Sequence, residues 1–428
     1  MRANILVAAT LVALAGCVVE QEQAPAPAGA AELRAAASDP RLAPLYEARG
    51  WRTAWATQSE AALRAAIGDA ERHGLDKAVF LDPIEAAATP AARDAALSLA
   101  ALAYAEALAR GRTDPARIRA PYTVPRPSAD LAAGLNAAIE SGGLARWFAG
   151  LPPQGEDYRL LSEAFVAANR QIAAAQGRPP PALIERARTL AVNLERRRWL
   201  ERAPPETRID VNTGAATLGY WREGALADTR RVVVGEPGRE TPELASPLYR
   251  LAANPTWTVP RSIESEVGGE AYMRRNNMER RDGWIVQRSG PRNSLGLVKF
   301  DMQNDEEIYL HDTPAKALFA QADRHASHGC VRVADALGFA AMIARDQGVL
   351  DQWERARATR EGGEPRETFV PLPRPIPVRL LYHTAFVERG RLVIVPDAYG
   401  WDDLVAEALG LPSRPRRAPR PRGGDIGP

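Results

Sequence analysis

The sequence predicts a multidomain α+β protein, with a helical N-terminal part followed by a mainly β C-terminal part. Residues 41–200 are rich in Ala and Leu at helical spacing, as in AALRAAIGDAERHGL and AALSLAALAYAEAL. From Thr207 the pattern changes to the alternation that is typical of strands. The chain has 428 residues, 46% of them hydrophobic, so it is long enough for several domains and a sizeable core.

The first segment, residues 1–17, is typical of an export signal. A single arginine precedes an apolar run that is too short for a permanent membrane-spanning helix. The run ends in LAGC, which resembles a bacterial lipobox and implies lipidation of Cys17. Val18 follows instead of an aspartate, and the analogy with lipoproteins then favours the outer membrane. An ordinary secretory signal with an incidental cysteine is the alternative. Both readings predict a periplasmic protein.

Two further segments lack the periodicity of folded elements. Residues 18–40 are rich in Ala, Pro, Glu and Gln, and we expect a flexible tether. Residues 412–428 end in the basic, Pro- and Gly-rich run SRPRRAPRPRGGDIGP, for which we expect a disordered tail. The net charge of +2 is too small to indicate a nucleic-acid partner.

In the helical part, Gly74 after His73 is typical of a helix C-cap, so His73 is interpreted as a last-turn histidine. Pro-rich breaks at 121–127 and 151–153 separate helices. In the β part, TRIDVNTG, AATLGYW, TRRVVVGEP, LGLVKF and EIYLHD are predicted strands. ADALGFAAMIARDQG is a predicted helix, and PVRLLYHTAFV with RLVIVP is a predicted hairpin, in which His383 has a structural role.

The stretch YLHDTPAKALFAQADRHASHGCVRV concentrates reactive residue types. It holds three of the five histidines, His311, His325 and His328, and one of the two cysteines, Cys330. If Cys17 is lipidated, Cys330 has no disulfide partner, and an unpaired thiol in an oxidising compartment indicates reactivity. A histidine within hydrogen-bond reach could take its proton, as nucleophilic acyl transfer requires.

The neighbours of this cysteine favour chemistry. Gly329 allows backbone N–H groups to approach a bound carbonyl closely, and Arg324 and Arg332 are expected to favour the thiolate. One alternative is a cysteine that only packs a core, but polar and basic neighbours do not suit an apolar pocket. A zinc site of His311, His325, His328 and Cys330 is another alternative, although the His-x-Cys spacing is unlike that of paired zinc ligands.

These motifs resemble a known family. HDT from His311 and SHGCVRV from Ser327 resemble the catalytic motif of the L,D-transpeptidase (YkuD) family. NPTWTVPRSI, GPRNSLGLVKF and NLERRRW resemble its large periplasmic YcbB-like branch. The resemblance covers most of residues 40–410. It implies a helical scaffold domain at 41–200 and a mainly β YkuD-type catalytic domain at 201–411.

The resemblance also implies a capping, lid-like insertion near 264–293, over the active site. A peptidoglycan-binding module usually precedes the NLERRRW segment in this branch. Here Asn169 to Val192 are too few for a separate core, so we expect that the module is missing. Recruitment to the glycan would then depend on the catalytic domain, the lipid anchor or another protein.

By the resemblance, Cys330 is the nucleophile that attacks a peptidoglycan stem peptide, and His311 is its general base. The main-chain carbonyl of Asp312 orients the imidazole ring. The N–H groups of Gly329 and Cys330 form the oxyanion hole, and His328 lines it.

Arg332 is expected to fix the loop or bind a stem-peptide carboxylate, with a purely structural ion pair as the alternative. Ser327, Arg324 and His325 are weaker candidates for the same site. No cofactor or metal is required. The expected product is a 3→3 cross-link between two stem peptides. The sequence leaves open a hydrolase such as an L,D-carboxypeptidase, a non-catalytic cell-wall-binding lipoprotein, and a protein amine as acceptor.

Overall fold

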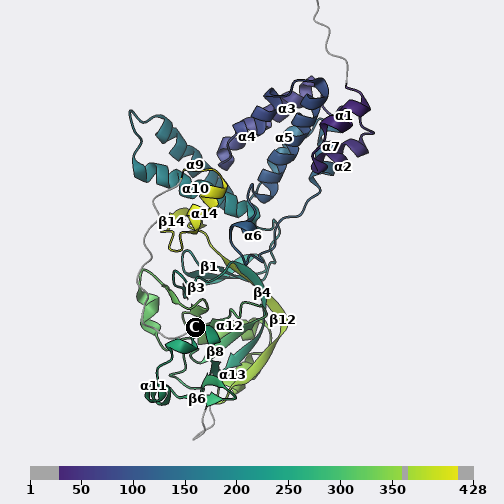
Figure 1. Ribbon diagram of the computed structural model, residues 1–428. Coiled ribbons are helices and arrows are strands. Elements are labelled where there is room, and N and C mark those ends of the chain that lie inside the picture. The colour runs from purple at the N-terminus through teal and green to yellow at the C-terminus, as the bar shows by residue number, and fades with distance from the viewer. Residues whose placement is uncertain (1–27, 359–364, 413–428) are drawn as a thin grey trace, which may run out of the picture.

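The computed structural model describes residues 28–358 and 365–412, in which a helical part is joined to a mainly β part (Figure 1). The predicted signal with Cys17 and the tail from residue 413 lie outside the described residues. The expected tether is shorter than predicted, because α1 (Ala30–Ala36) is helical and buries Leu33 in the core of the helical part. Its Ala-rich sequence has the helix propensity that the prediction overlooked.

The helical part is organised around one long buried helix, α5 (Pro90–Arg110). Thr89 caps its N-terminus by accepting a hydrogen bond from the Ala92 N–H at 3.2 Å, and Pro90 fills the first helical position. Its C-cap, Gly111, has a φ of +85°, and a Cβ there would lie 2.7 Å from Glu195 Oε1. The remaining bounds are η1 (Pro40–Leu42), α2 (Ala43–Ala48), α3 (Thr57–Gly68), η2 (Asp69–His73), α4 (Ala78–Glu85), α6 (Pro115–Ile118), α7 (Leu131–Glu140), α8 (Leu144–Gly150), α9 (Glu156–Ala173) and α10 (Pro181–Trp199).

Several helix boundaries agree with the sequence. The Pro-rich breaks fall between α6 and α7 and between α8 and α9, as predicted. Gly74 is the left-handed C-cap of η2, with a φ of +69°, which confirms the last-turn position of His73. The ring of His73 hydrogen-bonds the Tyr158 hydroxyl at 3.0 Å, and burial lowers the pKa of His73 to about 3.

The β part is built on a nine-stranded sheet in the order β10-β3-β11-β9-β8-β4-β12-β1-β2. The five segments predicted as strands all lie in it. The bounds are β1 (Arg208–Asn212), β2 (Thr217–Arg222), β3 (Ala225–Gly235), β4 (Leu244–Ala253), β8 (Val298–Met302), β9 (Leu310–His311), β10 (His325–Ser327), β11 (Val331–Val333) and β12 (Thr368–Leu381). The predicted hairpin forms a separate pair, β13 (Ala385–Glu388) and β14 (Arg391–Ile394).

The large sheet closes on itself through β3. The first half of this strand pairs with β2, and its second half pairs with β11 and β10. The burial of β3 agrees with this division. Its first part is mostly exposed, and its second part buries Val232, Val233 and Val234 in succession. The helices α12 (Ala336–Asp346) and α13 (Leu350–Arg357) add Phe339 and Trp353 to the same core.

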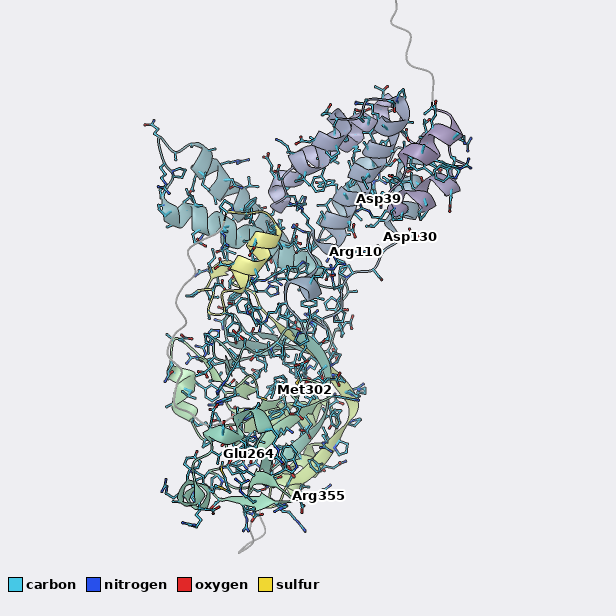
Figure 2. All side chains as sticks on the ribbon, viewed as in Figure 1. Asp39, Arg110, Asp130, Glu264, Met302 and Arg355 are labelled. Atoms are coloured by element: carbon cyan, nitrogen blue, oxygen red, sulfur yellow. The ribbon has the colours of Figure 1, made fainter. Side chains whose placement is uncertain are left out.

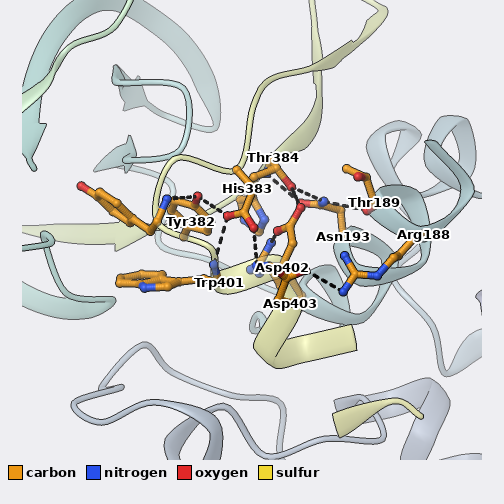
Figure 3. A network of polar contacts seen from close by, with 12 residues as sticks. Arg188, Thr189, Asn193, Tyr382, His383, Thr384, Trp401, Asp402 and Asp403 are labelled. Atoms are coloured by element: carbon orange, nitrogen blue, oxygen red, sulfur yellow. Dashed lines mark hydrogen bonds and ion pairs between the residues drawn. The ribbon is translucent and has the colours of Figure 1, made fainter. Parts of the chain in front are cut away.

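The helix α10 of the helical part binds the residues that follow β12, including α14 (Trp401–Ala408) (Figure 3). Asn193 donates to Thr384 Oγ1 at 2.7 Å and accepts from the Thr384 N–H at 3.0 Å. Thr384 Oγ1 in turn donates to Asp402 Oδ2 at 2.7 Å, on α14. Arg196 pairs with the other oxygen of Asp402. Most polar side chains of the NLERRRW segment are therefore buried, and Asn193 and Arg196 use them to hold the residues after β12.

We expect Arg196→Ala to lower the free energy of unfolding by about 3–5 kcal/mol, because the buried Asp402 carboxylate would lose its partner. Both side chains are 1% exposed. Urea denaturation followed by circular dichroism measures the change. Arg159→Ala is the matched control. Its ion pair with Glu163 is about half exposed on α9, and its loss should cost less than about 1 kcal/mol. Equal effects of the two substitutions would contradict the argument.

Candidate active site

His311 ends β9, and Cys330 directly precedes the parallel strand β11. In the pairing of β9 with β11, Leu310 lies opposite Val331 and His311 lies opposite Arg332. Leu310 and Val331 are fully buried in the core. Because side chains alternate along a strand, His311 and Arg332 face the other side of the sheet. Cys330 packs in the same core cluster as Val331, and Tyr309, whose ring meets that of His311, hydrogen-bonds the Cys330 thiol. Tyr309 is thus a neighbour of both predicted reactive residues.

Two positively charged residues are the cross-strand neighbours of His311. Across the sheet, His311 lies opposite Arg332 on β11 and opposite Lys299 on β8. His311 is fully buried, and the Tyr309 ring meets it edge to face at 5.7 Å between centroids.

The thiol of Cys330 is protonated at neutral pH. Burial raises its pKa to about 11, and hydrogen bonds from Tyr309 and the charges of Lys299 and Arg332 oppose that rise without cancelling it. The sequence led us to expect that arginines would favour the thiolate. Arg332 acts in that direction, but Arg324 donates to the carbonyls of Val232, Ala215 and Ala216, and burial outweighs the charges.

We expect the rate of Cys330 alkylation by iodoacetamide to rise about tenfold per pH unit from pH 7 to pH 10, because only the thiolate reacts. The rate should level only near pH 11, where the folded-state pKa lies. Peptide mass spectrometry measures the labelled fraction over time. Cys330→Ala is the control for labelling elsewhere. A plateau below pH 8 would instead indicate a preformed thiolate–imidazolium pair.

Hydrogen bonds fix both carbonyls of the loop around the nucleophile. Ser327 Oγ donates to the Cys330 carbonyl at 2.6 Å and accepts from the Gly329 N–H at 3.2 Å. Thr241 Oγ1 donates to the Gly329 carbonyl at 2.7 Å. Gly329 has a φ of +118°, in the region that favours glycine. The loop is thus held from within by Ser327 and from the β3–β4 loop by Thr241.

The Asp312 carboxylate is occupied by local contacts. It accepts from the Leu297 N–H at 3.0 Å and forms an ion pair with Lys316. The Asp312 N–H donates to the Val298 carbonyl at 2.9 Å, which continues the β8–β9 pairing. These bonds occupy the carboxylate, so it is not placed to orient the imidazole ring of His311. The prediction that the main-chain carbonyl of Asp312 has that role stays a prediction.

The predicted capping segment has more regular structure than its sequence indicated. It contains η3 (Arg261–Glu266), α11 (Glu270–Arg275), β6 (Met278–Arg281) and β7 (Trp284–Gln287), and β7 pairs with β5 (Trp257–Thr258). These elements share a small apolar core, against which Tyr309 also packs; it consists of Trp257, Val259, Ile263, Met273, Met278, Ile285 and Leu295. The apolar residues are too widely spaced among charges for a periodicity search to find them.

One charged bridge joins this capping segment to the nucleophile loop. Glu266 Oε2 lies 3.1 Å from His328 Nε2, and Arg239 of the β3–β4 loop binds the same carboxylate, with one contact at 3.2 Å. The bond from Arg239 is the main cause that lowers the pKa of Glu266. Figure 2 places Glu264, also on η3, far from Asp39 and Asp130 of the helical part. The capping segment therefore covers the β part alone.

The weaker candidates have structural partners. His325 Nδ1 lies 2.8 Å from Asp323 Oδ1, and its Nε2 lies 3.0 Å from the Thr213 carbonyl. His383 is buried beyond the end of β12, where desolvation lowers its pKa well below the usual value. Within residues 28–358 and 365–412, no three His, Cys, Asp or Glu side chains gather as metal ligands. None of the helices in these ranges is long and apolar enough to span a bilayer.

Sequence reasoning missed four residues around Cys330: Lys299, Tyr309, Thr241 and Glu266. Tyr309 and Lys299 come within two strands that were predicted, and their alternation with buried neighbours could have placed them on the face of His311. Thr241 and Glu266 lie in connections between strands. Nothing in their local sequence indicates that they approach the nucleophile loop.

Two family models match this sequence. Residues 206–361 match the L,D-transpeptidase catalytic domain, and residues 40–165 match the scaffold domain. A curated protein of Haemophilus influenzae, named "Putative L,D-transpeptidase", is 30% identical over 45% of this chain and 44% of its own length. The match therefore spans less than half of that relative.

Solved structures of the same kind are more distant. An L,D-transpeptidase from Mycobacterium smegmatis is 13% identical, with a TM-score of 0.23, over 42% of this chain and 60% of that chain. The catalytic domain of an E. faecium L,D-transpeptidase acylated by ertapenem is 15% identical, with a TM-score of 0.21, over 31% of this chain and 85% of that chain.

Proposed function

Since this chain belongs to the L,D-transpeptidase family, with a catalytic domain at residues 206–361 and a scaffold domain at residues 40–165, we propose that it forms 3→3 cross-links between peptidoglycan stem peptides. One observation supports the proposal: Tyr309 contacts both the His311 ring and the Cys330 thiol, and burial raises the pKa of that thiol to about 11.

In the proposed first half-reaction, Cys330 Sγ attacks the carbonyl between the diamino acid and D-alanine of a donor tetrapeptide. His311 takes the thiol proton as the sulfur–carbon bond forms, and it gives that proton to the D-alanine nitrogen as the carbon–nitrogen bond breaks. The raised pKa of Cys330 supports this order, because the proton must leave during the attack and not before it. The product is a thioester acyl-enzyme and free D-alanine.

In the proposed second half-reaction, the side-chain amine of another stem peptide attacks the thioester, and the thiol is regenerated. Water competes with the amine, and hydrolysis would make the protein an L,D-carboxypeptidase. The capping segment supports the transfer reaction. It is tied to the nucleophile loop through Glu266 and His328, and so it is placed to shield the thioester from water.

Muropeptide mass spectrometry with the purified full chain and disaccharide tetrapeptides tests the proposal. A 3→3 dimer with release of D-alanine is the expected result. Tripeptide without dimer would replace the proposal with the hydrolase, and a mixture with protein amines that yields protein-linked tripeptide would identify a protein acceptor. Intact tetrapeptide alone would favour a non-catalytic wall-binding protein.

We also propose a periplasmic location with a lipid anchor on Cys17, in the outer membrane. The sequence motif supports it, and Cys17 lies outside the described residues. Cell fractionation tests it directly. The wild-type chain is expected in the outer-membrane fraction, and Cys17→Ala is expected to shift it to the soluble periplasmic or inner-membrane fraction. An unchanged distribution would contradict the anchor.

A further inference from the structure

We propose that Thr241 is a positioning residue that aims the Cys330 N–H at the oxyanion of the reaction. The inference rests on the proposed acyl-transfer function. Thr241 is fully buried, and its hydroxyl is used twice: Oγ1 accepts from the Gly235 N–H at 2.9 Å and donates to the Gly329 carbonyl at 2.7 Å. It thus links the end of β3 to the residue before the nucleophile.

The bond to Gly329 fixes the direction of the next N–H. The carbonyl of Gly329 and the N–H of Cys330 belong to the same trans peptide unit, and in such a unit the two groups point in opposite directions. When Thr241 holds the carbonyl toward the β3–β4 loop, the Cys330 N–H points away from that loop. In the described part of the chain, no backbone oxygen accepts from this N–H. The Cys330 N–H is therefore available to a substrate oxygen.

The Gly329 N–H is placed differently. It donates to Ser327 Oγ at 3.2 Å, within the loop itself. Of the two N–H groups predicted to form the oxyanion hole, the structure thus presents that of Cys330 and turns that of Gly329 to Ser327. Orientation of a single peptide unit then has a large effect, because removal of one oxyanion donor typically slows catalysis by about 10²–10³-fold.

The neighbours of Thr241 restrict rotation of its side chain away from the Gly329 carbonyl. A Cβ at Gly235 would lie 2.6 Å from the Thr241 nitrogen, so only glycine permits this approach of β3 to the loop. The carbonyl of Gly235 accepts from the Tyr399 hydroxyl at 2.7 Å. Gly235, whose N–H donates to the Thr241 hydroxyl, is thus itself held in place, and the hydroxyl is fixed by partners on both sides.

The experiment compares two reactions of the same thiol. Acylation by p-nitrophenyl acetate forms a sulfur–carbon bond and expels p-nitrophenolate through a tetrahedral oxyanion, whereas alkylation by iodoacetamide displaces iodide without one. In Thr241→Val, we expect acylation to fall about 10–100-fold and alkylation to change by less than about twofold. Thr241→Ser keeps the hydroxyl and should retain at least about a third of the wild-type acylation rate. Thr241→Ala replaces Thr241→Val if the latter does not fold.

Three results would overturn the assignment: wild-type acylation in Thr241→Val, equal losses of acylation and alkylation, or no rescue by Thr241→Ser. Thermal melts of each variant check that it is folded. D-alanine release from tetrapeptide is measured in parallel. Because the ester needs no peptidoglycan recognition, a wild-type chain that reacts with the ester but releases no D-alanine contradicts the proposed function and not the role of Thr241.

Discussion

Cys330→Ala is expected to abolish the release of D-alanine from tetrapeptide, with a loss on the order of 10⁶-fold, the scale reached when a catalytic nucleophile is removed. No other thiol lies in the described part of the chain. The substitution removes one sulfur from a site that is 6% exposed, so the fold should persist, and a thermal melt checks this.

The measurement is D-alanine quantification together with intact-protein mass spectrometry. The wild-type chain should gain the mass of the tripeptide donor in the absence of an acceptor, and the variant should gain none. Cys330→Ser is the matched control, since it keeps the size of the side chain and supplies a poorer nucleophile. A folded Cys330→Ala variant that still releases D-alanine would remove the thioester from the mechanism.

His311→Gln is expected to lower kcat for D-alanine release by about 10²–10⁴-fold, the usual range for loss of a general base. The effect follows from the raised pKa of the thiol, which leaves little thiolate at neutral pH without a proton acceptor. The loss should shrink as the pH rises toward 11, because hydroxide then supplies the thiolate. Steady-state rates measured from pH 7 to pH 10 give the profile.

His325→Gln is the control for this substitution. It replaces another histidine of the same stretch, but one bound to Asp323 and the Thr213 carbonyl, and we expect less than about a threefold change in kcat. The alkylation profile of Cys330 should be the same in His311→Gln as in the wild type, since burial sets the thiol pKa. A shift of that profile to higher pH would show that the imidazole had been charged, since a lost imidazolium no longer favours the thiolate.

The sequence was sufficient for the architecture, and it predicted Cys330 and His311 as the reactive pair. Alternation after Thr207 predicted the strands, and the motif around Cys330 predicted the family, because several residue types must agree at fixed spacing. The capping segment near 264–293 was predicted only from the resemblance, because its sequence is polar and basic without periodicity. Its core is assembled from residues on five short elements and the segments between them, and tertiary contacts of that kind leave no local period.

The electrostatics of the nucleophile were predicted only in part: Arg332 favours the thiolate as expected, but the net shift of the thiol pKa is upward. Arginines near Cys330 in sequence suggested a stabilised thiolate, but sequence proximity does not show where a guanidinium points. Arg324 is directed to carbonyl groups behind the sheet. Desolvation of the sulfur is the larger effect on the thiol pKa. It depends on how many atoms surround the sulfur in the folded protein, which the sequence alone does not show.

The position of β12 has a practical consequence for dissection of this protein. It lies inside the sheet, with β4 on one side and β1 on the other. However, it begins at Thr368, after residue 361, the last residue that matches the catalytic domain. A truncated gene product that stops at residue 361 would leave two strand edges bare and would aggregate. Any excised enzyme must extend through β12, and its C-terminal continuation then reaches back to α10, so the two halves are best expressed as one polypeptide.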